Sequence, residues 1–207
     1  LPFMPVRSLL GSDVLAREAL SAEARARDPR TSPLKLREMD SPFKAGERVV
    51  LVPAINTEFS VIHVQKATAS GIVRIEGQSY ADVQQALCAA TVIVTCEELV
   101  SEESLRCEPE RNLIPLFAIQ YVCPVHWGAH PYAVYNYYDY DPRQLKYYHE
   151  AAESDDGFDR YLQRFVLGVK DHAGYLEAVG GVDRLGSLVA DPQYGYRPEL
   201  QRRRLDQ

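Results

Sequence analysis

The stretch Tyr80-Ala-Asp-Val-Gln-Gln-Ala-Leu-Cys-Ala-Ala-Thr-Val-Ile-Val-Thr-Cys96 joins a helical pattern directly to a strand pattern. In its first part, apolar or small residues recur at intervals of three and four, which places one helix face on Val83, Ala86, Leu87 and Ala90. Val92–Cys96 is then a continuous apolar run, typical of a strand covered on both faces. A helix that leads into a covered strand predicts an α/β domain with helices layered on a sheet.

Short β-branched runs before this stretch are predicted to be strands, and one apolar run after it is predicted to be another covered strand. They are Val49–Ala54, Phe59–Val64, Ile72–Ile75 and Ile114–Val122. At the amino end, Leu1–Asp13 is predicted to be a buried extended segment. Ser12 or Asp13 is expected to cap a helix that runs through Ala26.

The last third of the chain is predicted to be mainly helical. Asp141 followed by Pro142 is typical of a helix start. An amphipathic stripe follows between Phe158 and Val169, and Asp171 is expected to cap a further helix that ends at Gly180-Gly181. The final apolar run, Leu185–Ala190, is predicted to be an edge strand.

Composition and charge exclude several classes of protein. The 207 residues have average contents of apolar and charged side chains, which fits one folded domain spanning 1–207. The net charge is −6, with a basic cluster only at Arg202–Arg204, so no nucleic-acid partner is expected. No apolar run approaches the roughly 18 residues of a membrane helix, and Leu1–Leu10 does not have the pattern of a secretory signal, so no membrane association is expected.

Four cysteines are widely spaced, with no CxxC pair and no nearby pair of histidines: Cys88, Cys96, Cys107 and Cys123. This pattern argues against a metal site. Most of them lie in apolar surroundings, where a free thiol behaves as a small hydrophobic residue. We therefore predict buried, reduced thiols and a cytoplasmic location.

Glu97 is the first candidate site residue, because it follows directly on the covered strand. In open α/β sheets, ligands bind beyond the carboxyl ends of strands, so a carboxylate there can reach a substrate. The alternative is that one of the pair Glu97-Glu98 faces solvent while the other fixes a neighbouring loop or starts a helix.

A loop containing His126 and His130 follows the last predicted covered strand. Two imidazoles four positions apart suit acid–base chemistry, although they equally suit a packed loop in which they bond to backbone carbonyls. Arg7 and Ser8 stand between apolar residues, where a guanidinium and a hydroxyl can face a carboxylate or phosphate. A structural salt bridge is the alternative for Arg7. The usual self-contained catalytic motifs, such as GxSxG, HExxH and the Walker loop, do not occur.

Several strings, taken together and in order, resemble the α subunit of glutaconate CoA-transferase, a family I CoA-transferase. They are Leu1–Asp13, Ser41–Arg48, Val52–Ala54, Ile62–Gln65, Val94–Glu98, Gly128–Pro131, Tyr138–Asp141, Lys170–His172 and Tyr175-Leu176. The resemblance covers nearly the whole chain. It implies a three-layer α/β/α CoA-transferase-like domain of which 1–207 is the C-terminal part.

The same resemblance implies a function. Members move CoA between an acyl-CoA and a free carboxylate, such as the dicarboxylate glutaconate, through a glutamyl-CoA thioester. A carboxylate nucleophile splits this exchange into easier acyl-transfer steps. That glutamate belongs to a homologous β subunit, so no catalytic residue is expected in this chain. Arg7, Ser8, Glu97 and His130 are expected to line the shared cleft, with no metal and no cofactor beyond the CoA thioester as substrate.

The resemblance also leaves alternatives. The family's opening strands and helices are not matched here, so a separate chain is expected to supply them unless this chain is processed or truncated. Relatives with this fold include ring-opening hydrolases and decarboxylases of CoA thioesters, so the fold leaves the reaction open. A non-catalytic scaffold subunit is the remaining alternative.

Overall fold

The computed structural model describes residues 2–18 and 20–200, and its centre is a four-stranded sheet of order β5-β4-β6-β7. The basic cluster at 202–204 lies outside the described residues. β4 (Thr57–Ala67), β6 (Ala89–Leu99) and β7 (Tyr121–Pro124) run parallel, and the short β5 (Val73–Arg74) pairs antiparallel with β4. The three parallel strands create one sheet edge at which all their carboxyl ends meet.

Helix α2 (Asp82–Cys88) leads directly into β6, as the spacing of its apolar residues predicted. Ala86 is buried against the sheet together with alternate residues of the two central strands: Ile62, Val64, Val92, Val94 and Cys96. The opposite sheet face is open near the amino ends of the strands, since Phe59 is 58% exposed and Val61 is 65% exposed.

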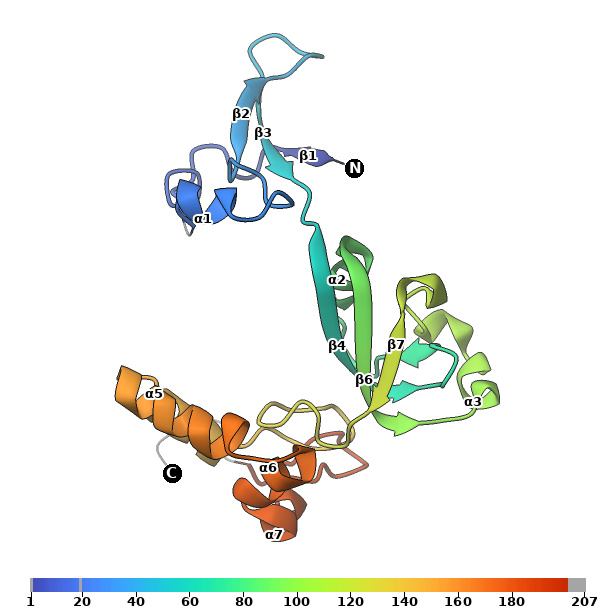
Figure 1. The fold of residues 1–207 in the computed structure, drawn as a ribbon. Coiled ribbons are helices and arrows are strands. Elements are labelled where there is room, and N and C mark those ends of the chain that lie inside the picture. The colour runs from blue at the N-terminus through green and yellow to red at the C-terminus, as the bar shows by residue number, and fades with distance from the viewer. Residues whose placement is uncertain (1, 19, 201–207) are drawn as a thin grey trace.

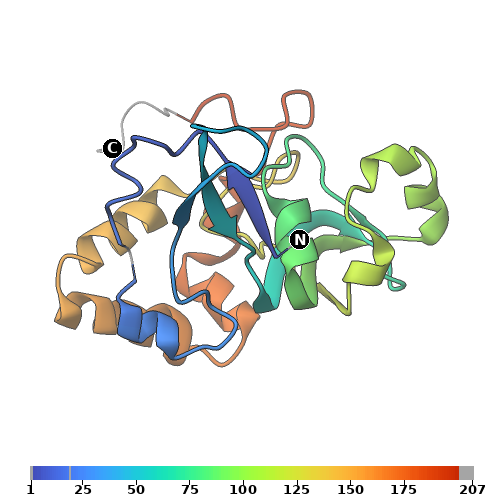
Figure 2. The ribbon, with the colours of Figure 1, turned by 90° about the horizontal axis from the view of Figure 1, so that it is seen from above.

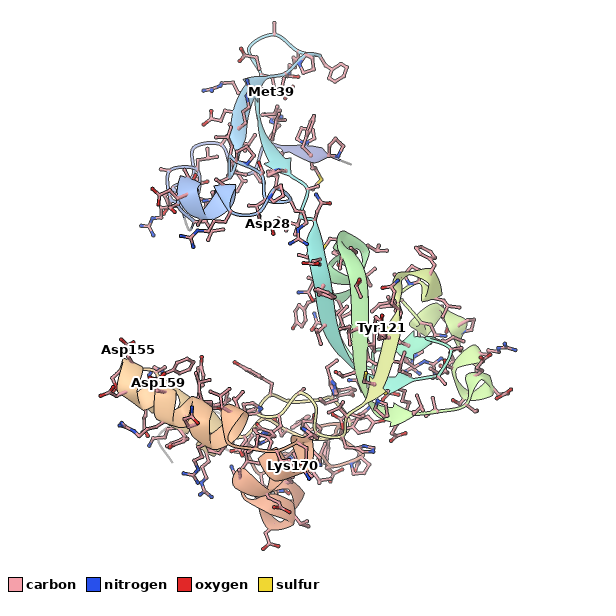
Figure 3. All side chains as sticks on the ribbon, viewed as in Figure 1. Asp28, Met39, Tyr121, Asp155, Asp159 and Lys170 are labelled. Carbon is pink, nitrogen blue, oxygen red and sulfur yellow. The ribbon has the colours of Figure 1, made fainter. Side chains whose placement is uncertain are left out.

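A second, three-stranded antiparallel sheet of order β1-β3-β2 precedes the first. It contains β1 (Phe3–Val6), β2 (Arg37–Asp40) and β3 (Arg48–Pro53). Figure 1 shows this sheet standing away from the rest of the chain, joined to it through the β3–β4 connection, and Figure 3 shows Met39 on it far from Tyr121 of β7. β1 is extended as predicted but largely exposed, so the expected burial of this segment is wrong.

The amino-terminal helix is much shorter than predicted. Only α1 (Ala22–Ala26) forms, and its cap is Ser21, which accepts a hydrogen bond from the Ala24 N–H. Residues 13–16 make turns instead. The weak apolar stripe explains the difference, because a helix that buries no face gains little from packing.

The carboxyl-terminal part is helical, as predicted. It contains α4 (Pro142–Ala151), α5 (Asp155–Leu162) with a π-helical turn at Gln163–Leu167, α6 (His172–Ala178) and α7 (Gly181–Gly186). The side chains of Asp141 and Asp171 cap α4 and α6, which confirms both predicted helix starts. Figure 1 shows these helices gathered beyond the carboxyl ends of the parallel strands, and in Figure 2, which looks down on the molecule from above, they lie to the left of those strands.

Two predicted strands are wrong or too long. Leu185–Ala190 finishes α7 and then makes a single bridge between Val189 and Tyr138. Ile114–Val122 contributes only its end to β7. The run is broken by Pro115, which precedes a 3-10 turn at Leu116–Ala118 and offers no N–H to a sheet. Two further short helices, α3 (Glu102–Arg106) and the 3-10 turn Pro109–Arg111, lie between β6 and this turn.

All four cysteines are free, but only Cys96 is buried. Cys107 and Cys123 are exposed, so the predicted burial is wrong for them. Among the described helices, none has the length and apolar character needed to cross a bilayer.

Candidate functional site

The register between the two central strands assembles a chain of polar side chains. His63 of β4 lies directly beside Thr95 of β6, and Glu97 follows two residues later on the same face, because side chains alternate along a strand. The His63 ring contacts both neighbours: its Nδ1 lies 2.8 Å from Thr95 Oγ1, and its Nε2 lies 2.7 Å from Glu97 Oε1. Three polar groups thus meet near the carboxyl ends of the two central strands.

The Glu97 carboxylate, only 3% exposed, also holds the loop that follows β7. It accepts hydrogen bonds from the Trp127 N–H at 2.8 Å, from the Gly128 N–H at 3.3 Å and from the Tyr138 hydroxyl at 2.5 Å. Burial alone would raise the pKa of Glu97, but the hydrogen bonds from His63, Tyr138 and Trp127 together lower it. Glu97 is therefore ionised at neutral pH.

Tyr138 completes the attachment of this loop. Its ring stacks on Trp127 with 4.2 Å between centroids, and its hydroxyl accepts a hydrogen bond from the Ala129 N–H at 3.1 Å. Burial, followed by the hydrogen bond to the Glu97 carboxylate, raises the pKa of Tyr138. The phenol consequently stays protonated and donates to Glu97.

His130, near the end of the same loop, belongs to a second buried cluster. Its Nδ1 lies 2.7 Å from the Tyr175 hydroxyl and its Nε2 lies 3.2 Å from Asp141 Oδ2. Asp141 also accepts from the Arg184 Nε at 3.1 Å and caps α4 through the Gln144 N–H at 3.0 Å. Burial would raise the pKa of Asp141, but the hydrogen bonds from His130 and Arg184 hold it well below its usual value.

A cavity of about 720 Å³ lies against the first cluster. His63 and Tyr138 form part of its wall. The charged residues in its lining are acidic, Glu76, Asp82 and Asp139, and no lysine or arginine contributes to the described lining. The cavity therefore favours neutral groups or hydrogen-bond donors over an anion.

Gly128 allows the loop to approach the His63 ring. A Cβ at this position would lie 2.7 Å from His63 Cε1 and 2.8 Å from the Val125 carbonyl oxygen, which is backbone and cannot rotate away. We expect Gly128→Ala to lower the free energy of unfolding by about 1–3 kcal/mol, measured by urea denaturation. The matched control is Gly186→Ala, because a Cβ there meets nothing within 4 Å. Equal stability of the two variants would contradict this account.

The structure separates the four predicted site residues into two groups. Glu97 and His130 lie in the two clusters described above, since Glu97 binds the amides of the loop at 125–131 and His130 belongs to that loop. Arg7 and Ser8 follow β1 in the other sheet, where Arg7 makes a 3.1 Å salt bridge to Glu47 and its side chain is 74% exposed. Ser8 is also exposed. Within this chain Arg7 and Ser8 therefore do not contact the clusters that contain Glu97 and His130.

Sequence reasoning missed His63, Thr95 and Tyr138. A signal existed for the first two, since His63 and Thr95 are polar residues inside apolar strands. Their pairing depends on strand register, which local spacing does not reveal. The other histidine of the loop, His126, contributes a backbone contact: its carbonyl oxygen accepts a hydrogen bond from His172 Nε2 at 2.7 Å.

Comparisons with known proteins bear on this arrangement, although no family model matches the chain. The chain is 38% identical over 200 residues to the A subunit of glutaconate CoA-transferase from Acidaminococcus fermentans, in a match that covers 97% of this chain and 62% of that protein. The crystal structure of glutaconate coenzyme A-transferase from that organism matches with a TM-score of 0.87 and 38% identity, over 95% of this chain and 62% of the other.

Two more distant relatives have different names. The A subunit of 3-oxoadipate CoA-transferase from Pseudomonas knackmussii is 29% identical over 84% of this chain and 56% of its own length. The cholesterol ring-cleaving hydrolase IpdA subunit of Rhodococcus jostii is 28% identical over 83% of this chain and 55% of its own length.

The mixed sheet and the helices beyond its strand ends define a CoA-transferase-like α/β domain, which confirms the predicted fold class. Within that class, the resemblance to the α subunit of glutaconate CoA-transferase is confirmed over nearly the whole chain. The chain spans 62% of the length of that subunit.

Proposed function

We propose that this chain is part of the α subunit of a CoA-transferase, which moves CoA between an acyl-CoA and a dicarboxylate such as glutaconate. The observation that carries the proposal is the 38% identity to the A subunit of glutaconate CoA-transferase over 97% of the chain. The free thiols, all four of the cysteines, fit the reducing cytoplasm in which we expect the enzyme to work.

The proposed nucleophile is a glutamate of a partner β subunit. Glu97 is a poor candidate for that role, because its carboxylate already accepts four hydrogen bonds from this chain and is 3% exposed. The described lining of the cavity also contains no lysine or arginine, so the anionic parts of the substrates need cations from elsewhere. A hetero-oligomer whose partner completes the cleft meets both requirements.

Within that cleft, Glu97 and His130 would contribute by fixing the wall formed by loop 125–131. Arg7 and Ser8 would contribute from the other sheet, where the Arg7 guanidinium is exposed enough to meet a carboxylate. These four substrate-binding positions are part of the proposal.

The test is chemical trapping in the assembled enzyme. This chain, coexpressed with its β subunit, should transfer CoA from acetyl-CoA to glutaconate. Chromatography of the CoA esters measures this transfer. Hydroxylamine or borohydride added after acetyl-CoA should abolish that transfer and modify a glutamate of the partner, identified by mass spectrometry. Addition of the same reagents without acetyl-CoA is the control.

The similarity to the ring-cleaving hydrolase subunit supports a second candidate, a ring-opening hydrolase of this fold that acts on a CoA thioester. Activity that is unaffected by the trapping reagents, that adds water across a ring bond while the CoA thioester stays intact, and that does not depend on an acceptor carboxylate would replace the transferase proposal with this one. Transfer that is unchanged after alanine substitution at Arg7, Ser8, Glu97 and His130 would favour a scaffold role.

A further inference from the structure

Strand β4 has an open edge in this chain. It pairs with β6 along its length, whereas on its other side β5 pairs only with its last two residues. Successive backbone N–H groups of a strand point to opposite edges, and the Thr68 N–H points to the β5 side, where it donates to the Ile72 carbonyl at 2.8 Å. Because the register with β6 is continuous, the N–H groups of Ser60 and Ile62 point to the same side. Within the described part of the chain, no strand pairs with them there.

This open edge lacks the features that protect edge strands in soluble proteins. Such edges commonly carry proline, lysine or a bulge, which block pairing with another chain. The segment 57–65 contains no proline and no lysine, and its register with β6 continues without a bulge. The segment therefore has the character of an interior strand, although it lies at an edge here.

An apolar groove of about 830 Å³ opens on the same edge. Its lining includes three consecutive residues of β4, Phe59, Ser60 and Val61, whose side chains alternate between the two faces of the sheet. Residues of β1 and of the β3–β4 connection also line it, as do residues of α2. The described lining contains no charged side chain, so the groove suits apolar side chains of an occupant. Figure 1 shows β4 as the outer long strand, on the side of the sheet away from β7.

One face of the sheet is also uncovered beside this edge. Val61, Ile93 and Tyr121 lie side by side across β4, β6 and β7, and Val61 is 65% exposed and Tyr121 60% exposed. Parallel sheets are normally covered on both faces, because the crossovers between their strands lie over those faces. A strand added parallel to β4 needs such a crossover, of about a dozen or more residues, which can cover this face.

We propose that the open edge of β4 receives a strand from the part of the α subunit that lies outside the match with glutaconate CoA-transferase, and that apolar side chains of this part fill the groove. The match leaves more than a third of the A subunit of Acidaminococcus fermentans outside it, which is length enough for strands with their crossovers. This inference rests on the α-subunit assignment of the proposed function and holds for either candidate reaction.

The β subunit is not the expected occupant, because the proposed shared cleft lies at the other end of the sheet. Glu97 and the loop at 125–131 lie near the carboxyl ends of the strands, whereas the groove is lined by residues at the amino end of β4. A second copy of this chain, joined edge to edge, would pair the two β4 strands but leave the open sheet face of each copy uncovered.

The test coexpresses this chain with a probe, which is the part of the Acidaminococcus fermentans A subunit outside the match. This chain should copurify with a tag placed on the probe. Hydrogen exchange followed by NMR compares the bound chain with the free chain. The Ser60 and Ile62 N–H groups should exchange at least about tenfold more slowly in the complex, because they gain hydrogen-bond partners there.

Val61→Lys tests the groove. Because Val61 is 65% exposed in this chain, the variant should fold, as checked by circular dichroism. It should weaken binding of the probe by at least about tenfold, measured by calorimetric titration, since a charge would be buried among apolar groups. The matched control is Val182→Lys, because Val182 is 86% exposed on α7 and does not line the groove, so binding should be unchanged.

Ser60→Pro tests the edge. Proline removes the N–H that points away from β6 and is tolerated at sheet edges, so the variant should lose affinity for the probe while keeping the circular dichroism of the wild type. Ser60→Ala, which keeps the N–H, is its control and should bind normally.

Failure of the probe to copurify, or equal affinity of Val61→Lys and wild type, would overturn the proposal. Sedimentation of the chain alone as a dimer that Val61→Lys dissociates would assign the groove to a second copy, and slowed exchange at Ser60 with the β subunit alone would assign it to that subunit. Either result would also overturn the proposal. Absence of CoA transfer in a complex that binds the probe would refute the proposed reaction and leave the docking surface standing, so the two failures are distinguishable.

Discussion

Replacing Glu97 with alanine is expected to lower the free energy of unfolding by about 3–5 kcal/mol. The substitution removes the acceptor of four hydrogen bonds, from the His63 ring, the Tyr138 hydroxyl and the N–H groups of Trp127 and Gly128. Buried donors without a partner are costly because they have lost their water and gained nothing in return. The effect should be this large because one carboxylate ties β4, β6 and the loop at 125–131 together.

Urea denaturation followed by circular dichroism measures this effect, with Glu177→Ala as the control. Glu177 is exposed on α6, so its loss should change stability by less than about 0.5 kcal/mol. If Glu97→Ala were as mild as the control, the carboxylate could not be holding the loop.

Asp141→Ala is expected to lower the free energy of unfolding by about 4 kcal/mol. The Asp141 side chain, which is 1% exposed, accepts from His130 and Arg184 and also caps α4. Removing the Asp141 carboxylate leaves the partly buried Arg184 guanidinium without its partner, and this accounts for most of the loss in the free energy of unfolding. The substitution also deletes a helix cap worth about 1 kcal/mol. Asp141→Asn keeps one acceptor oxygen for the cap but loses the charge and the second acceptor, so it should be the milder variant.

The same carboxylate predicts a pH dependence. Because the pKa of Asp141 is lower in the folded chain than its ordinary value of 3.8, its charge contributes stability that is fully present above that value. This contribution is lost as the pH falls through the folded pKa. The stability difference between wild type and Asp141→Asn should therefore be constant from about pH 5 to 7 and shrink in more acidic solution.

Chemical denaturation at a series of pH values tests this expectation. Gln144→Ala is the comparison variant. Gln144 contacts Asp141 through its backbone N–H, which the substitution keeps, so this variant should retain the pH dependence that comes from Asp141. A stability difference between wild type and Asp141→Asn that grows on acidification would show that Asp141 is not stabilised in its charged form.

Local sequence was sufficient where one short segment contains the whole interaction. The helix at Asp82–Cys88 and the strand that follows it were predicted from spacing alone, because an amphipathic face and an apolar run are local properties. The caps at Asp141 and Asp171 were predicted for the same reason, since each bonds to an N–H three residues away. The prediction of a long amino-terminal helix was wrong because its apolar stripe is weak and the helix that forms buries no residue.

Glu97 and His130 were selected as candidates from their position after predicted strands, although their partners in the folded chain were not predicted. Sequence by itself determined the class of fold, the helix starts at Asp141 and Asp171, and the presence of polar residues near the strand ends. Tertiary structure decided that His63 meets Thr95 and Glu97, that Tyr138 and the loop at 125–131 fold onto the same carboxylate, and that Arg7 lies on a different sheet. Pairings between residues about 30 to 40 positions apart depend on strand register and loop closure, whose energies belong to the folded chain as a whole and leave no periodic trace in its sequence.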